Sequence, residues 1–128
     1  MLQPKAYSKE KQKVYDVKYI DFDNETLELL TEQQFDFYAH VYDFDEVEFM
    51  ENTGMKDKNG KYIYEGDIVT VNGTWDCVIQ YNQSSCAFVL KSIDSRWSMG
   101  YFSNYDDIEE MLEVIGNIYE NKDLLGVR

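Results

Sequence analysis

Few side chains in this sequence combine the types and spacings that catalysis requires. A serine or cysteine nucleophile needs a base beside it, usually histidine, but the single histidine, His40, has no Ser or Cys within five residues. We interpret His40 as an ordinary loop or partly packed residue. Cys77 and Cys86 match no metal-binding or redox spacing, and both lie in apolar, strand-like stretches, so we expect reduced core residues. We therefore assign no catalytic residue and expect a protein that is not an enzyme.

Carboxylate pairs are numerous, and a pair can divide acid and base roles when burial separates the two pKa values. In a chain this acidic we interpret such pairs as solvated surface charge. The pairs are Asp21/Asp23, Asp43/Asp45, Asp106/Asp107 and Glu109/Glu110.

The segment Asp57–Gly60 (DKNG) superficially matches a calcium-binding loop. Aligning Gly60 with the glycine of such a loop places Met55 at the first ligand position and Gly66 at the bidentate acid position. Neither residue offers a side-chain oxygen, so we reject a calcium site and expect no bound metal. The glycine patterns of phosphate-binding and dinucleotide-binding loops are also missing, so we expect no cofactor.

Charge is distributed unevenly along the chain. The 128 residues carry 25 acids against 12 bases, a net charge of −13. Residues 1–18 are net basic, whereas residues 19–55 contain eleven acids and no Lys or Arg. Phosphate backbones and anionic membranes are bound through Lys and Arg, so we expect neither nucleic acid nor membrane as a partner. An apolar run long enough to span a bilayer and a signal-peptide core are both missing, which favours a cytoplasmic protein.

The first third of the chain predicts a hairpin followed by an irregular region. Val14–Phe22 has the composition of a strand, Asp23–Thr26 has turn chemistry, and Leu27–Leu30 would be the returning strand. Residues 31–43 are ambiguous between a short helix and irregular structure. Strict alternation in the first strand would place Lys18, Ile20 and Phe22 on one face and Val17, Tyr19 and Asp21 on the other.

A further strand follows the ambiguous region. Asp43–Met50 fits a strand only if its register slips near Asp45-Glu46, by a bulge or bend. We expect Asn52–Gly54 to end it.

The remainder is more regular. Asn59-Gly60 is a strong hairpin signal, and further turns are expected at Glu65–Asp67 and Asn72-Gly73. Asp106–Leu112 has helical character, with Ile108, Met111 and Leu112 on one face. The expected strands are Ile68–Val71, Thr74–Tyr81, Ala87–Leu90, Arg96–Phe102 and Val114–Tyr119.

Short strands at this spacing predict a mainly β fold. We expect a small SH3-like barrel over residues 56–120, with an N-terminal β-hairpin extension and one short C-terminal helix. Residues 1–55 would form the hairpin and acidic segment, and residues 56–128 the barrel subdomain.

Two long motifs carry a family resemblance. Phe49–Val69 (FMENTGMKDKNGKYIYEGDIV) resembles the hallmark segment of YopX-like proteins of phages and prophages, and Val114–Asn121 (VIGNIYEN) resembles their terminal motif. Asp16–Phe22 is also similar to the family. The chain departs from the family at residues 4–7 (PKAY) and at Lys122, which both lie at edges.

The resemblance implies an origin in a phage or prophage and a location in the bacterial host cytoplasm. It supplies no catalytic residue. The residues of the hallmark also favour a folding role: Gly54, Asn59, Gly60 and Gly66 fit turns that need positive φ, and Asp67 can accept hydrogen bonds from turn amides.

Aromatic residues are the remaining functional signal. They could form a stacking platform of the kind that small barrels use for bases or peptides, although we expect most of them in the core. The candidates are Trp75, Tyr81, Phe88, Trp97, Tyr101 and Phe102.

Four functions remain in order of preference. The first is a non-enzymatic protein–protein interaction module that binds another protein or itself. The alternative is an acidic DNA-mimic inhibitor of a host nucleic-acid-binding protein, with Asp21, Asp23 and Glu25 spaced along a strand like successive phosphates, although the expected turn at Asp23 interrupts the row. A nucleic-acid-binding barrel is disfavoured by charge. An enzyme that uses acids alone would need a deep pocket with a buried carboxylate pair.

Overall fold

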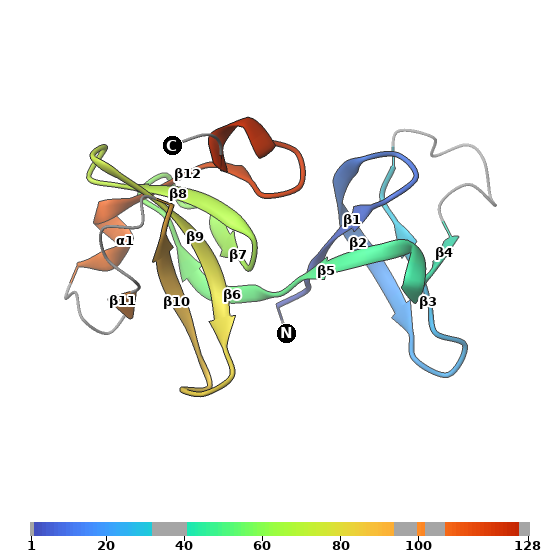
Figure 1. Cartoon of the computed structure of the whole chain (residues 1–128). Coiled ribbons are helices and arrows are strands. Elements are labelled where there is room, and N and C mark those ends of the chain that lie inside the picture. Colours follow the sequence, from blue (N-terminus) through green and yellow to red (C-terminus); the bar gives the residue numbers. More distant parts are fainter. Residues whose placement is uncertain (1, 32–40, 94–99, 102–106, 126–128) are drawn as a thin grey trace. The chain divides into compact units, whose positions relative to one another are not determined.

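The computed structural model describes residues 2–31, 41–93, 100–101 and 107–125. The chain divides into two compact units, unit 1 from Met1 to Glu51 and unit 2 from Asn52 to Arg128. The division lies at 51/52, where the sequence suggested 55/56. Antiparallel strands dominate both units (Figure 1), and the described residues contain one short α-helix. The predicted mainly β fold is therefore confirmed.

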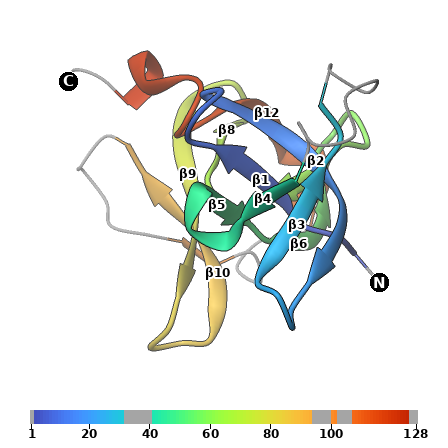
Figure 2. The ribbon, with the colours of Figure 1, turned by 90° about the vertical axis from the view of Figure 1, so that its right-hand side faces the viewer.

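Unit 1 is a five-stranded antiparallel sheet. The predicted hairpin is present as its β2 and β3, but β1, β4 and β5 extend it to a full sheet, whose strands Figure 2 shows in front. The strand β1 pairs with β5 in the register Lys5↔Met50, so it joins residues far apart in the sequence. The strands in spatial order are β4 (Val41–Asp43), β3 (Thr26–Leu29), β2 (Lys13–Asp21), β1 (Lys5–Ser8) and β5 (Val47–Met50).

The bend expected near Asp45-Glu46 is a 3-10 helix, Phe44–Glu46, immediately before β5. The Glu46 carboxylate accepts a hydrogen bond from the N–H of Asp43 at 2.9 Å, which closes this turn. Of the ambiguous stretch 31–43, residues 41–43 form β4, whereas residues 32–40, including His40, lie outside the described residues.

Unit 2 contains a curled five-stranded sheet and a two-stranded ribbon. The strand β5 ends at Met50, as expected, but Asn52–Gly54 is itself the start of the next strand, β6, with a positive φ of 81° at Gly54 and a shift in register before Lys56. The β9–β10 hairpin extends beyond the rest of the sheet in Figures 1 and 2. The sheet order is β11 (Gly100–Tyr101), β10 (Ala87–Ser92), β9 (Trp75–Asn82), β8 (Asp67–Val71) and β12 (Leu112–Asn117), and the ribbon is β6 (Asn52–Lys56) with β7 (Tyr62–Tyr64).

Helix α1 (Ile108–Met111) confirms the predicted helical segment, and a 3-10 helix spans Lys122–Leu125. Ile108 and Leu112 are buried in the core of unit 2 and Met111 packs against it, so the expected apolar face is correct. The strand expected over Arg96–Phe102 is described as β11 alone, because residues 94–99 and 102–106 lie outside the described part of the chain.

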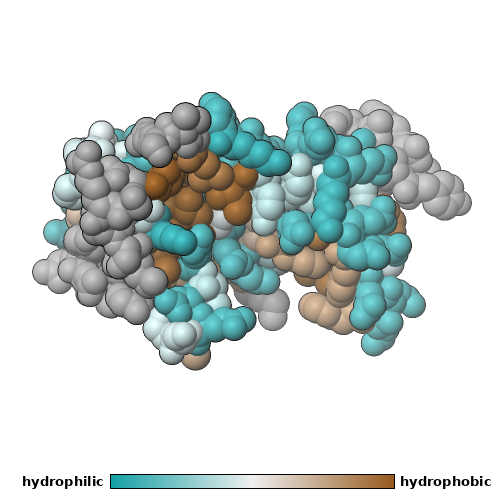
Figure 3. Space-filling model, viewed as in Figure 1, coloured by the Kyte–Doolittle hydropathy of each residue, from teal (hydrophilic) through white to brown (hydrophobic). Residues whose placement is uncertain are grey.

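Each unit has its own apolar core. In unit 1, side chains from all five strands meet, and Ala6, Leu27 and Leu29 are almost fully buried. In unit 2, β8 lies between β9 and β12 and is buried along most of its length. The curled sheet has the barrel-like form expected from the sequence. Apolar surface also reaches the outside of unit 1, where hydrophilic atoms border it (right side of Figure 3).

Candidate functional site

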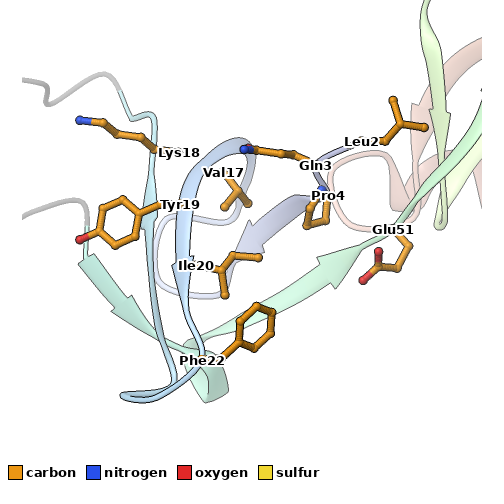
Figure 4. Close-up of a pocket in the computed structure, with 9 residues that line it drawn as sticks. All are labelled: Leu2, Gln3, Pro4, Val17, Lys18, Tyr19, Ile20, Phe22 and Glu51. Carbon is orange, nitrogen blue, oxygen red and sulfur yellow. The ribbon is translucent and has the colours of Figure 1, made fainter.

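A pocket of about 410 Å³ opens on unit 1 beside the second half of β2 (Figure 4). Its lining is mainly apolar. From β2 and the turn after it come Val17, Lys18, Tyr19, Ile20 and Phe22. The rest of the lining is Leu2, Gln3 and Pro4, which precede β1, and Glu51, which follows β5.

A β-bulge in β2 creates this lining. The first half of β2 pairs with β1 up to Asp16, the second half pairs with β3, and the register shifts between Val17 and Tyr19. The bulge turns Ile20 and Phe22 toward the side where Pro4 and Glu51 lie, whereas Lys18 and Tyr19 extend the other way (Figure 4). The alternation expected for this strand is therefore wrong: Val17 is buried, and Ile20 packs against the same core cluster.

Phe22 is the most exposed apolar side chain in the described part of the chain, with 75% of its surface accessible. Its ring nevertheless has aromatic neighbours within the unit. It contacts Phe44 edge-to-face at a centroid distance of 6.0 Å, and Phe44 contacts Phe49 in the same way at 5.4 Å. Exposed aromatic rings are enriched among interface anchors, because they supply a large contact area at a low cost in conformational entropy.

The charged residues in and next to the pocket lining are mostly acids. Asp21 and Asp23 flank Phe22 in the sequence, and Glu51 lies in the lining. The ammonium of Lys18, the one cationic group in the lining, lies 3.2 Å from the Glu28 carboxylate and is largely neutralised by it. Glu51 forms no ion pair with any residue described in the structure. Acids therefore outnumber bases among these residues.

Asp21 serves the turn rather than catalysis. Its carboxylate accepts hydrogen bonds from the side-chain amide of Asn24 at 2.8 Å and from the N–H groups of Asn24 and Asp23 at 3.2 and 3.1 Å. The side-chain amide of Asn24, followed by the N–H of Asn24, lowers the pKa of Asp21 below its ordinary value. The strand-like row of phosphate-spaced acids is also absent, because Asp23 lies in the turn and Glu25 has a left-handed φ of 53°.

The other carboxylate pairs are not assembled into a buried dyad in the described part of the chain. Asp43 and Asp45 are exposed, as are Glu109 and Glu110. Asp107 is exposed as well, and its neighbour Asp106 lies outside the described residues. Within those residues, no group of three His, Cys, Asp or Glu is placed to hold a metal ion. No helix among them is long and apolar enough to cross a bilayer.

The aromatic residues of unit 2 are divided between core and surface. Phe88 packs against the core and contacts Tyr81 edge-to-face at 5.3 Å, whereas Tyr81 and Trp75 are 44% and 51% exposed. Of the six aromatic residues expected in a stacking platform, the structure describes the side chains of these three, which lie on β9 and β10. Trp97 and Phe102 lie outside the described residues, as does the side chain of Tyr101.

The two cysteines differ, which corrects the expectation that both are core residues. Both are free thiols; Cys77 is fully buried, whereas Cys86 is exposed in the β9–β10 turn with a φ of 54°. The sequence placed Cys86 in a strand because the turn was expected one residue earlier; the observed register pairs Tyr81 with Phe88. Burial, with a contribution from the charge of Asp76, raises the pKa of Cys77 to about 11.

The hallmark segment folds around a buried carboxylate, Asp57. One oxygen accepts hydrogen bonds from the N–H groups of Asn59 and Lys61, each at 2.9 Å, and the other accepts the N–H of Val114 at 3.0 Å. Burial alone would raise the pKa of Asp57, but these three donors together outweigh it and hold the pKa below its ordinary value. The carboxylate therefore connects the hairpin turn to β12. Its role is structural, in the segment whose sequence superficially matches a calcium-binding loop.

A second buried acid closes the next turn: Asp67 accepts a hydrogen bond from the N–H of Tyr64 at 2.8 Å, as expected. Asp67 also pairs with Asn117 across β8 and β12, so the two family motifs lie side by side. A side chain at Gly116 would meet the Asn121 amide oxygen at 2.6 Å, and this oxygen accepts the N–H of Asn117. Most of the two long motifs thus specifies packing and turns in unit 2, although the hallmark begins in unit 1 and includes Glu51 of the pocket lining.

The fold and the sites together define a small, mainly β protein in which unit 1 carries an apolar pocket and unit 2 contains most of the two long sequence motifs. The chain belongs to the YopX family: residues 5–126 match the family described as YopX protein. Its structure is similar to that of protein EF1440 from Enterococcus faecalis, with a TM-score of 0.63, 22% sequence identity and 97% of each chain covered. At this identity the similarity concerns the fold alone. No curated protein matches the sequence.

Proposed function

We propose that this protein is a non-enzymatic protein–protein interaction module and that the pocket of unit 1 is its contact surface. The observation that carries the proposal is Phe22, an aromatic ring that is three-quarters exposed at the pocket and contacts Phe44 edge-to-face. Burying such a side chain against a partner is worth about 2 kcal/mol, so leaving it exposed suits a binding role. An origin in a phage or prophage and action in the bacterial cytoplasm are part of the same proposal.

The test is affinity capture from a bacterial lysate with quantitative mass spectrometry, comparing wild type with Phe22→Ser. Tyr81→Ser is the matched control, because Tyr81 is also an exposed aromatic ring with an edge-to-face partner, but in unit 2. We expect a captured protein that is lost with Phe22→Ser and retained with Tyr81→Ser. Equal capture by all three proteins, or a loss confined to Tyr81→Ser, would contradict the proposal.

Self-association is the other form that such a contact could take. Size-exclusion chromatography with light scattering distinguishes it, because a dimer formed through the pocket would dissociate on Phe22→Ser. A monomer at all concentrations supports a partner of different sequence.

A further inference from the structure

The strand β2 has an open edge at the pocket. It spans Lys13–Asp21, but β1 pairs with it only from Lys13 to Asp16. From Val17 to Asp21 its strand neighbour is β3 alone, in the described part of the chain. The segment across from this edge is Leu2–Pro4, and Pro4 lacks the N–H that would extend the β1 ladder.

An open strand edge next to an apolar pocket is the arrangement that proteins use to bind an extended peptide as an added strand. The backbone supplies main-chain hydrogen bonds, and alternate side chains of the peptide point into the pocket or away from it. Here the edge from Val17 to Asp21 and the pocket share residues, because Val17 and Ile20 belong to both.

Charge indicates which peptide fits. Asp21, Asp23 and Glu51 carry negative charge around the edge, the cation of Lys18 is paired with Glu28, and the whole chain has a net charge of −13. Such a field attracts cations and repels acidic segments.

We infer that the pocket and the open edge of β2 bind an extended, cationic segment of a partner protein, which adds as a strand and inserts an apolar side chain beside Phe22. This inference rests on the proposed function and specifies the partner's chemistry. Lys or Arg residues of the segment would face Glu51 and the acids that flank Phe22, and an aliphatic or aromatic residue would cover Ile20.

The test is selection from a library of random short linear peptides with the full-length protein as bait. We expect the selected peptides to carry Leu, Ile, Val or Phe two residues away from a Lys or Arg, because residues two apart in an extended segment point to the same face. N-methylation of alternate peptide amides should weaken binding about tenfold or more, because it removes the main-chain donors. Phe22→Ser should weaken it by about tenfold, Glu51→Gln by roughly two- to fivefold, and Tyr81→Ser should leave it unchanged.

Several results would overturn the inference: acidic or no selected peptides, tolerance of N-methylation at every amide, binding insensitive to Phe22→Ser, or a wild-type dimer that occupies the pocket. These failures are separable from failure of the proposed function. A lysate partner lost with Phe22→Ser, together with no cationic strand-forming peptide, would retain the interaction module and refute the strand-addition mode.

Discussion

Replacing Asp57 by Asn tests whether the hallmark segment holds unit 2 together. The carboxylate accepts three N–H groups through two oxygens and is 4% exposed. The amide of Asn has one accepting oxygen, so it can keep the bonds to Asn59 and Lys61, but its NH₂ group then faces the N–H of Val114. The loss of one charge-assisted hydrogen bond and a buried unpaired donor should cost about 2–4 kcal/mol. This is a large share of a domain stability of roughly 5–15 kcal/mol.

Urea unfolding followed by tryptophan fluorescence measures this cost, because both tryptophans lie in the sequence of unit 2. Asp123→Asn is the matched control: Asp123 is exposed, and its substitution should change the unfolding free energy by less than about 0.5 kcal/mol. If Asp57→Asn behaved like Asp123→Asn, the role assigned to the buried carboxylate would be wrong.

The pH dependence gives a second check on Asp57. Its pKa lies below the ordinary value, so the unfolded chain binds a proton here more readily than the folded protein does. Its stabilising contribution is therefore complete above the ordinary pKa range of aspartate and is lost as the pH falls through the lowered pKa. The stability gap between wild type and Asp57→Asn should shrink between pH 7 and pH values below about 4. A gap independent of pH would contradict the assignment.

Three further predictions concern other parts of the chain. Gly60→Val should destabilise unit 2 by about 1–3 kcal/mol, because φ at Gly60 is 81° although nothing crowds its Cβ position; an unchanged thermal midpoint would refute this. One thiol, Cys86, should react with a thiol reagent in the folded protein and Cys77 only after unfolding; two reactive native thiols, or none, would be contrary. Fluorescence anisotropy should detect no appreciable binding to duplex or single-stranded DNA at physiological salt, and micromolar, salt-sensitive binding would show the opposite.

Local signals predicted the turns and many strands correctly. The hairpin β2–β3 follows from Asp and Asn side chains that bond nearby amides, and the role of Asp67 depends on an amide three residues away. Such contacts are visible in a sequence because both partners lie within one turn.

Local sequence signals do not predict contacts between residues that are far apart in the sequence. The bond between Asp57 and Val114 joins residues 57 positions apart, and β1 pairs with β5 across most of unit 1. The bulge after Val17 reversed the expected faces of β2, because one inserted residue shifts every later side chain to the other face. The pocket was missed for this reason. The one available signal was Phe22 itself, a large apolar residue placed between two acids at a turn.

The most direct test of the binding surface is amide hydrogen exchange, measured on the free protein and on its complex with the protein that wild type captures. We expect exchange to slow in residues 17–22 of the complex, because a partner covers the pocket and the open edge of β2. Exchange in the β9–β10 hairpin should stay as it is in the free protein. Slowed exchange in that hairpin, with residues 17–22 unchanged, would contradict the assignment of the pocket as the contact surface.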